Sequence, residues 1–201
     1  MQTETAIALL GFAFVMSISP GPGNFLLLAS GVNFGFARSV PLIFGISSGF
    51  LTMVFLVGIG LGQVLTTTPG LYTALKFACA AYVVWLAWKI ARSRSIGPDQ
   101  QEMPGKPITF IQAALFQFVN PKAWAVALIV TVSYTNPADY TASLTILIML
   151  FAMINLPALS FWALSGVFLR GFLGQGNRLL FFNFSMAVLL LTSMSVVLLK
   201  S

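Results

Sequence analysis

Few side chains in this 201-residue chain are suited to acid–base, nucleophilic or metal chemistry. The sequence has no His, a single Cys at position 79, and four carboxylates, none of which lies inside a long apolar run. Without imidazole or a cluster of thiolates, zinc, haem and redox centres lack their usual ligands. We therefore expect no metal and no other cofactor, and an intramembrane enzyme is the least favoured class of function.

Lys122 is the one ionisable side chain that the pattern of apolar residues places near the middle of a membrane span. A charge at that depth costs at least about 2.5–3.5 kcal/mol and usually marks a transport pathway. No acidic residue shares its span, so its partner is either the carboxylate of a substrate or backbone carbonyls freed by a helix break. Two other interpretations stay open: Lys122 gives up its proton during a working cycle, or it snorkels to the membrane interface.

The composition requires a bilayer, because 58% of the residues are hydrophobic, only 7% are charged and the mean hydropathy is +0.95. Soluble domains are about 25% charged. At about 20 residues per span, the chain holds roughly six transmembrane helices and no second domain. We predict an all-α membrane protein, a single transmembrane domain of residues 1–201, with spans at about 5–32, 41–63, 71–90, 108–132, 142–168 and 179–199.

The polar segment 92–106 divides the chain into a first half, 1–91, and a second half, 107–201, with three spans each. Positive residues beside span ends are retained in the cytoplasm. Seven lie on the side of this linker: Arg38, Lys89, Arg92, Arg94, Lys106, Arg170 and Arg178. Only Lys76 and Lys200 lie on the other side. This count predicts a cytoplasmic linker and two periplasmic termini, and it explains the net charge of +6 without a nucleic-acid partner.

Both halves begin with an interrupted span. The first interruption contains Pro20, Gly21, Pro22, Gly23 and Asn24, and the second contains Asn120, Pro121 and Lys122. Proline removes a backbone donor, and glycine allows dihedrals that are closed to other residues. Paired breaks in two inverted halves indicate a transport site near the midplane, whereas a simple proline kink would only shape packing. We expect Asn24 to cap a new half-helix at its N-terminus.

Asn155 and Pro157 predict a third interruption, in the fifth span. Asn155 then either lines the transport cavity or forms a hydrogen bond between helices. The pairs Gly45/Gly49 and Gly58/Gly62 have the spacing of close helix contacts and are interpreted as packing positions.

Several of these motifs resemble the LysE/RhtB family of amino-acid exporters. They are Pro20-Gly21-Pro22-x-Asn24, Ala29-Ser30-Gly31-x-Asn33-x-Gly35, Gly45-Ile46, Ala81-Tyr82 with Leu86, and Phe118-x-Asn120-Pro121-Lys122. The resemblance covers residues 5–132, and the rest of the chain is similar to the family only in its hydropathy. Residues 80–89 and 106–108 are most similar to the subgroup that exports cysteine and O-acetylserine.

The resemblance implies a homodimeric bacterial inner-membrane exporter of amino acids, driven by an ion gradient. Many relatives carry Asn or Asp where this chain has Gly23, so a coupling role for a carboxylate there is not carried over.

We therefore predict an exporter of small amino acids or their derivatives, with an amino-acid substrate and membrane lipid as its partners. The alternative is a passive pore or a flippase-like protein. The predicted substrate-binding residues are Pro20, Gly21, Pro22, Gly23, Asn24, Asn120, Pro121, Lys122 and Asn155.

Overall fold

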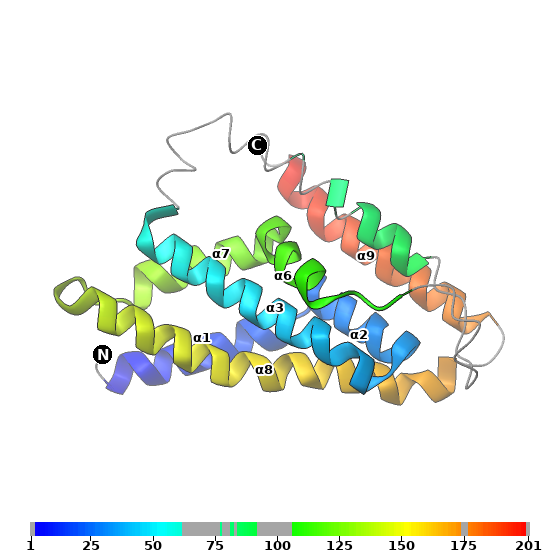
Figure 1. Ribbon diagram of the computed structural model, residues 1–201, viewed down its shortest axis with the longest axis horizontal. Helices are drawn as coiled ribbons and strands as arrows, with labels where there is room; N and C mark the ends of the chain where they lie inside the picture. The colour runs from blue at the N-terminus through cyan, green and yellow to red at the C-terminus, as the bar shows by residue number, and fades with distance from the viewer. Residues whose placement is uncertain are drawn as a thin grey trace.

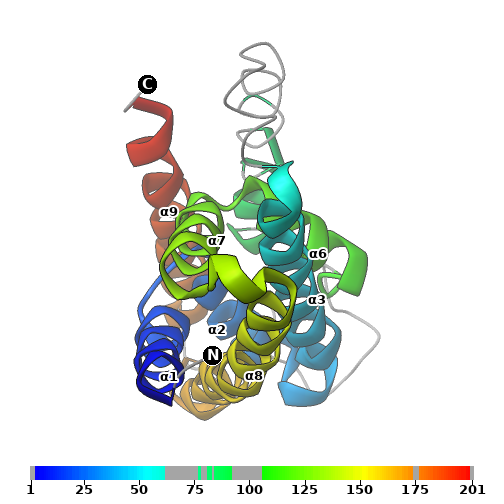
Figure 2. The same ribbon diagram turned by 90° about the vertical axis from the view of Figure 1, so that its left-hand side faces the viewer.

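The computed structural model describes residues 3–61, 77, 81–82, 84–91, 106–173 and 177–199. This part of the chain is helical and contains no β-strand, which confirms the all-α class (Figures 1 and 2). The elements are α1 (Thr3–Ile18), α2 (Pro22–Phe34), α3 (Phe36–Leu56), the π-helical turn η1 (Val57–Leu61), α6 (Phe110–Val119), α7 (Pro121–Tyr134), the 3₁₀ turn η2 (Pro137–Asp139), α8 (Tyr140–Leu173) and α9 (Arg178–Leu199).

Two helix pairs are bent at the predicted interruptions. The axes of α1 and α2 differ by 55°, and those of α6 and α7 differ by 71°. In each pair the second helix starts with proline, Pro22 or Pro121, at a position where the missing N–H is not needed. Proline therefore ends one helix and begins the next, and each pair has the length and hydropathy of one broken membrane span.

Two further helices are long and apolar enough to cross a membrane without a break, Phe36–Gly60 and Pro137–Leu173. The described chain thus has two candidate spans, or four when each bent pair counts as one. Large hydrophobic side chains on the outside of the bundle are well exposed, among them Ile7, Phe77, Val132, Phe168 and Phe181. Such an apolar exterior is suited to lipid, and the protein is a multi-pass membrane protein.

Glycines set the closest helix contacts. A Cβ on Gly31 in α2 would collide with the carbonyl oxygen of Ala163 in α8, and one on Gly166 would collide with that of Leu28. Across α3 and α6, a Cβ on Gly49 would lie 2.6 Å from the Cα of Ala114. These helices pack backbone against backbone. The packing interpretation of Gly45 and Gly49 is confirmed, because a Cβ on Gly45 would meet the carbonyl of Phe110.

A buried amide pair connects α2 with α9. The Asn33 side chain donates to Oδ1 of Asn183 over 2.9 Å, and the Asn183 side chain donates back to Oδ1 of Asn33 over 3.1 Å. Both side chains are buried. The pair therefore fixes the last helix of the chain against the first broken span.

The predicted elements differ from the structure in three places, one of which is the end of the fifth span, predicted at 168 and observed at Leu173. The second span was predicted to begin at 41, but α3 starts at Phe36 because Gly35, at φ 79°, turns the chain within one residue and the helix then includes Pro41. The prediction of a third interruption at Asn155 and Pro157 is wrong, because α8 is one continuous helix from Tyr140 to Leu173. Half of the span 71–90 and all of the linker except Lys106 lie outside the described residues.

Candidate functional site

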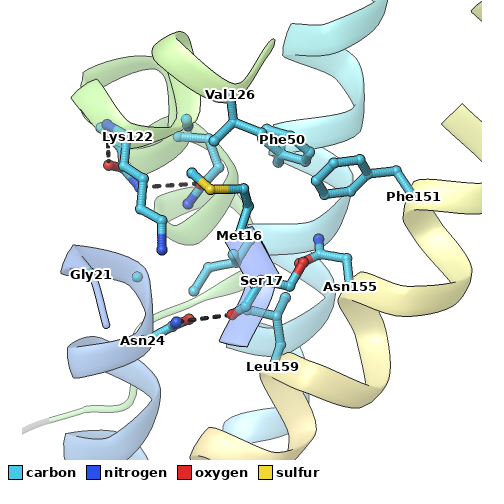
Figure 3. A pocket seen from close by; sticks show the side chains of 15 residues that line it. Met16, Ser17, Gly21, Asn24, Phe50, Lys122, Val126, Phe151, Asn155 and Leu159 are labelled. Carbon is cyan, nitrogen blue, oxygen red and sulfur yellow. Dashed lines mark hydrogen bonds between the residues drawn. The ribbon is translucent and has the colours of Figure 1, made fainter. Parts of the chain in front are cut away.

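The two helix breaks face one cavity of about 60 Å³ (Figure 3). That volume has room for a few water molecules. The cavity lies between α1, α2, α3, α6, α7 and α8, and is lined by Met16, Ser17, Gly21, Gly23, Asn24, Ile46, Phe50, Gln117, Asn120, Lys122, Ala123, Val126, Phe151, Asn155 and Leu159. Its wall therefore combines an apolar portion with a group of amide, hydroxyl and ammonium side chains.

The structure brings six of the nine predicted site residues to this cavity: Gly21, Gly23, Asn24, Asn120, Lys122 and Asn155. The three prolines do not line it. Pro22 and Pro121 begin α2 and α7, and Pro20 lies in the connection between α1 and α2. The prolines thus shape the breaks, while their neighbours face the cavity.

Side chains satisfy the last carbonyls of α1, which have no intrahelical donor. The Asn24 side chain donates to the carbonyls of Ser17 (3.0 Å) and Ser19 (2.8 Å), and the indole N–H of Trp162 donates to the carbonyl of Ile18 (3.1 Å). The hydroxyl of Ser19 donates to the carbonyl of Met16. The end of α1 is therefore held by residues of α2 and α8.

The predicted role of Asn24 as an N-terminal cap is wrong. The N-cap position of α2 is Gly21, which makes no side-chain hydrogen bond, and Asn24 lies inside the first turn. Its amide points back across the break (Figure 3) and caps the C-terminus of α1 instead. The physical reason is that Asn can donate as well as accept, and the free carbonyls of α1 lie within its reach.

Lys122 reaches across from the second break to the first. Its ammonium donates to the carbonyl of Ser19 over 2.7 Å and to the hydroxyl of Ser19 over 2.8 Å. The C-terminus of a helix carries a partial negative charge, which favours a cation. Of the two partners considered for Lys122, the carbonyls freed by a break are the ones that it contacts in this structure.

Asn120 organises the second break. Its side-chain oxygen accepts a hydrogen bond from the backbone N–H of Lys122 over 3.1 Å and so caps the N-terminus of α7. The indole N–H of Trp124 donates to the carbonyl of Phe118, near the end of α6, over 2.8 Å. This contact parallels that of Trp162 at the end of α1, so an indole covers a carbonyl at each break.

Asn155 was indicated by the sequence, but its neighbours in this part of the cavity were not. Asn155 donates to the hydroxyl of Ser47 in α3 over 3.4 Å while also lining the cavity, so both interpretations of Asn155 hold. Phe50 and Phe151 pack with ring centroids 4.8 Å apart and form part of the apolar wall (Figure 3). No local motif marks Ser47, Phe50 or Phe151, because they meet through the packing of α3 against α8. Ser19 did carry a signal, namely its position directly before Pro20.

Gly21 allows the close approach of the Lys122 side chain and is not used for its dihedral freedom, which corrects the sequence interpretation. Its backbone is extended, at φ −174°, and the described glycines with positive φ are Gly35 and Gly60. A Cβ on Gly21 would lie 2.9 Å from Cδ of Lys122, whereas a Cβ on Gly23 would make an ordinary 3.6 Å contact with Ile46. Gly21 therefore leaves space for the Lys122 side chain.

Substituting these two glycines by alanine is expected to give different results. Gly21→Ala should displace the Lys122 side chain and lower substrate efflux severalfold, while Gly23→Ala should stay near wild type because its methyl group fits. Efflux rates per molecule of inserted protein measure the difference. Equal efflux by the two variants would contradict the close-approach role of Gly21.

The cavity is suited to a small zwitterion. The N-terminus of α2 carries a partial positive charge and N–H groups without intrahelical acceptors, while the C-terminus of α1 carries the opposite charge. Within the described ranges, no three His, Cys, Asp or Glu side chains form a group that could hold a metal ion. The site can therefore bind and orient a charged solute through helix ends, amides and the Lys122 ammonium.

A bundle of apolar helices with two bent helix pairs around a partly polar cavity has the architecture of a membrane transporter. A family described as LysE type translocator matches residues 14–199. The chain therefore belongs to the LysE family of translocators, which confirms the predicted family and indicates a transporter and not an enzyme.

Curated relatives agree with this assignment. The chain is 34% identical over 184 residues to the cysteine/O-acetylserine efflux protein of Escherichia coli O139:H28, covering 90% of each chain. It is also 34% identical over 183 residues to the proteins of the same name from Escherichia coli K12 and Shigella flexneri, covering 89% of this chain and 90% of each relative. No solved structure matches the chain significantly.

Proposed function

We propose that this protein exports small amino acids or their derivatives, with cysteine and O-acetylserine as the first candidates, across the bacterial inner membrane. The observation that carries the proposal is the convergence of both helix breaks and Lys122 on one cavity. The efflux activity in the names of the curated relatives supports it. Predicted homodimer formation remains an expectation and is not needed for this cavity.

The substrate carboxylate binds at the N-terminus of α2, within reach of Lys122. There the N–H groups of Gly23 and Asn24 precede the first intrahelical hydrogen bond, which Phe25 donates to the carbonyl of Gly21. An anion is favoured at a helix N-terminus by up to about 1 kcal/mol when exposed, and by more when partly buried. The substrate side chain lies against Met16, Phe50 and Phe151.

The full architecture that we propose has six spans in two inverted halves. In support, each half begins with a bent helix pair, α1–α2 or α6–α7, followed by an unbroken apolar helix, α3 or α8. Each break also has an indole that donates to a carbonyl at the end of the first helix of the pair. The segment 71–90 supplies the third span and α9 the sixth, and the linker 92–106 joins the halves.

The ends of the bundle differ in charge. The end of α2, the start of α3, the end of α8 and the start of α9 lie at one end in Figure 1, and these elements carry Arg38, Arg170 and Arg178. Glu4 and Asp139 belong to the start of α1 and to η2, at the opposite end. By the positive-inside rule we assign the basic end to the cytoplasm, together with the linker, and both termini to the periplasm.

This orientation predicts the behaviour of topology reporters. A reporter active only in the periplasm is expected to be active when fused after Ser201 and inactive when inserted at Gln100. A reporter active only in the cytoplasm serves as the control and should give the reverse pattern. If Gln100 proves periplasmic, the orientation and the inverted arrangement are both wrong.

Export itself is tested by overexpression in cells that lack their own exporters. Cells that produce the protein are expected to accumulate more external cysteine or O-acetylserine, and to tolerate higher internal levels, than cells that produce the Lys122→Met variant. Transport into everted membrane vesicles then separates an exporter from a passive pore. Accumulation against a concentration gradient, lost when the ion gradient is collapsed, supports an exporter, and equilibration alone supports the pore.

A further inference from the structure

We propose that the C-terminal end of α1 is a binding subsite for the α-ammonium group of the substrate, formed by the carbonyl and hydroxyl oxygens of Ser19. In this structure the ammonium of Lys122 occupies that subsite, at 2.7 and 2.8 Å from the two oxygens. The proposal rests on the proposed export of amino acids and adds the recognition of the second substrate charge.

The chemistry of the subsite is that of a cation acceptor. A carbonyl at the end of a helix can only accept hydrogen bonds, and the helix dipole adds a partial negative charge at the same place. Primary ammonium groups have three donors, and the bonds they form to such oxygens are among the stronger hydrogen bonds in proteins. Lys122 and an amino acid present the same group, so each fits the Ser19 oxygens.

In the empty protein Lys122 takes the place of the substrate ammonium and is not part of a fixed ion pair. The carboxylates in the described part of the chain are Glu4 and Asp139, and both are exposed. Asn24 already holds the Ser19 carbonyl from the other side. The ammonium therefore has helix-end oxygens as partners, and it can leave them when a free carboxylate offers a stronger attraction.

Exchange follows from these contacts. When a zwitterionic substrate enters the cavity, its carboxylate attracts Lys122 and its ammonium replaces that of Lys122 at Ser19. The Ser19 oxygens have a cation partner in both the empty and the loaded protein, so the exchange replaces each hydrogen bond that it breaks at these acceptors. Lys122 thus acts as an internal competitor for the ammonium subsite.

Purified protein in detergent tests this exchange with two fragments of cysteine. Cysteamine keeps the ammonium and lacks the carboxylate, whereas 3-mercaptopropionate keeps the carboxylate and lacks the ammonium. Lys122→Met removes the competitor, so this variant is expected to bind cysteamine about tenfold or more tightly than wild type. Its affinity for 3-mercaptopropionate should fall, because the cation that receives the carboxylate is gone.

Matched variants control the experiment. Lys89→Met removes a lysine that lies outside this cavity and should leave the affinity for both fragments unchanged. Adding Ser19→Ala to Lys122→Met removes one of the two oxygens and should reduce the gain for cysteamine severalfold. Lys122→Gln, which is neutral and polar, replaces Lys122→Met if the latter does not fold, with the same expected gain relative to wild type.

If a folded Lys122→Met or Lys122→Gln variant binds cysteamine no more tightly than wild type, the proposed ammonium subsite is wrong. The same holds if Lys89→Met increases the cysteamine affinity as much as Lys122→Met does. Because binding is measured without transport, the two proposals fail separately. If Lys122→Met binds cysteamine more tightly but the wild-type protein exports no amino acid, the ammonium subsite is supported and the proposed function is wrong. If the protein exports amino acids but Lys122→Met shows no increase in cysteamine affinity, the function is supported and the subsite is wrong.

Discussion

Replacing Lys122 with Met is expected to reduce amino-acid export at least about tenfold while the protein still folds and inserts. The substitution keeps the length of the side chain but removes the ammonium that, in the proposed function, receives the substrate carboxylate. Losing a hydrogen bond to a charged group corresponds to about 1.5–3 kcal/mol, hence the expected factor. Efflux per molecule, with protein amount determined by immunoblot of the membrane fraction, measures the effect.

Lys122→Arg separates the two roles of the positive charge. If Lys122 only binds the substrate carboxylate, Arg should retain measurable export, because a guanidinium also binds carboxylates. If Lys122 must release a proton to couple export to a gradient, Arg should fail, because it stays protonated. Wild-type export by a correctly inserted Lys122→Met variant would remove Lys122 from the site and leave the backbone of the two breaks.

Gly31→Ala should destabilise the whole bundle. The added methyl group would collide with the Ala163 carbonyl and lie 3.1 Å from the Cα of Gly166, and neither is a flexible side-chain atom that can move aside. Helices α2 and α8 would have to separate, at a cost of about 1–3 kcal/mol or more. We expect a fall of roughly 5 °C in the melting temperature of the detergent-solubilised protein.

Gly11→Ala is the matched control for this substitution. Gly11 is also a glycine inside an apolar helix, but a Cβ there would meet no atom within 4 Å. Its melting temperature should equal or slightly exceed that of wild type, because alanine favours the helix. Equal stability of Gly31→Ala and Gly11→Ala would show that α2 and α8 tolerate a wider separation.

The helix breaks could be predicted because their cause is local. Proline lacks an N–H and clashes with the preceding turn wherever it lies, so Pro20, Pro22 and Pro121 mark the breaks without knowledge of the fold. Pro157 shows the limit of that argument. The helix α8 continues through it and packs along α1, α2 and α3.

The contacts between the breaks could not be predicted from the sequence. The hydrogen bond from Lys122 to Ser19 spans 103 residues, and that from Trp162 to Ile18 spans 144. Such contacts depend on how the helices cross, which is determined by close approaches such as that of Gly31 to Ala163. The sequence identified the residues with suitable chemistry, but not which helix end each would contact.

The amide pair between Asn33 and Asn183 has a consequence for biogenesis. The two residues are 150 positions apart, so at a synthesis rate of about 5–20 residues per second α2 emerges from the ribosome roughly 8–30 s before its partner helix. During this interval the nascent chain holds α2 in the bilayer without α9. The docking of α9 against α2 can thus take place only after Asn183 has been synthesised and α9 has entered the membrane.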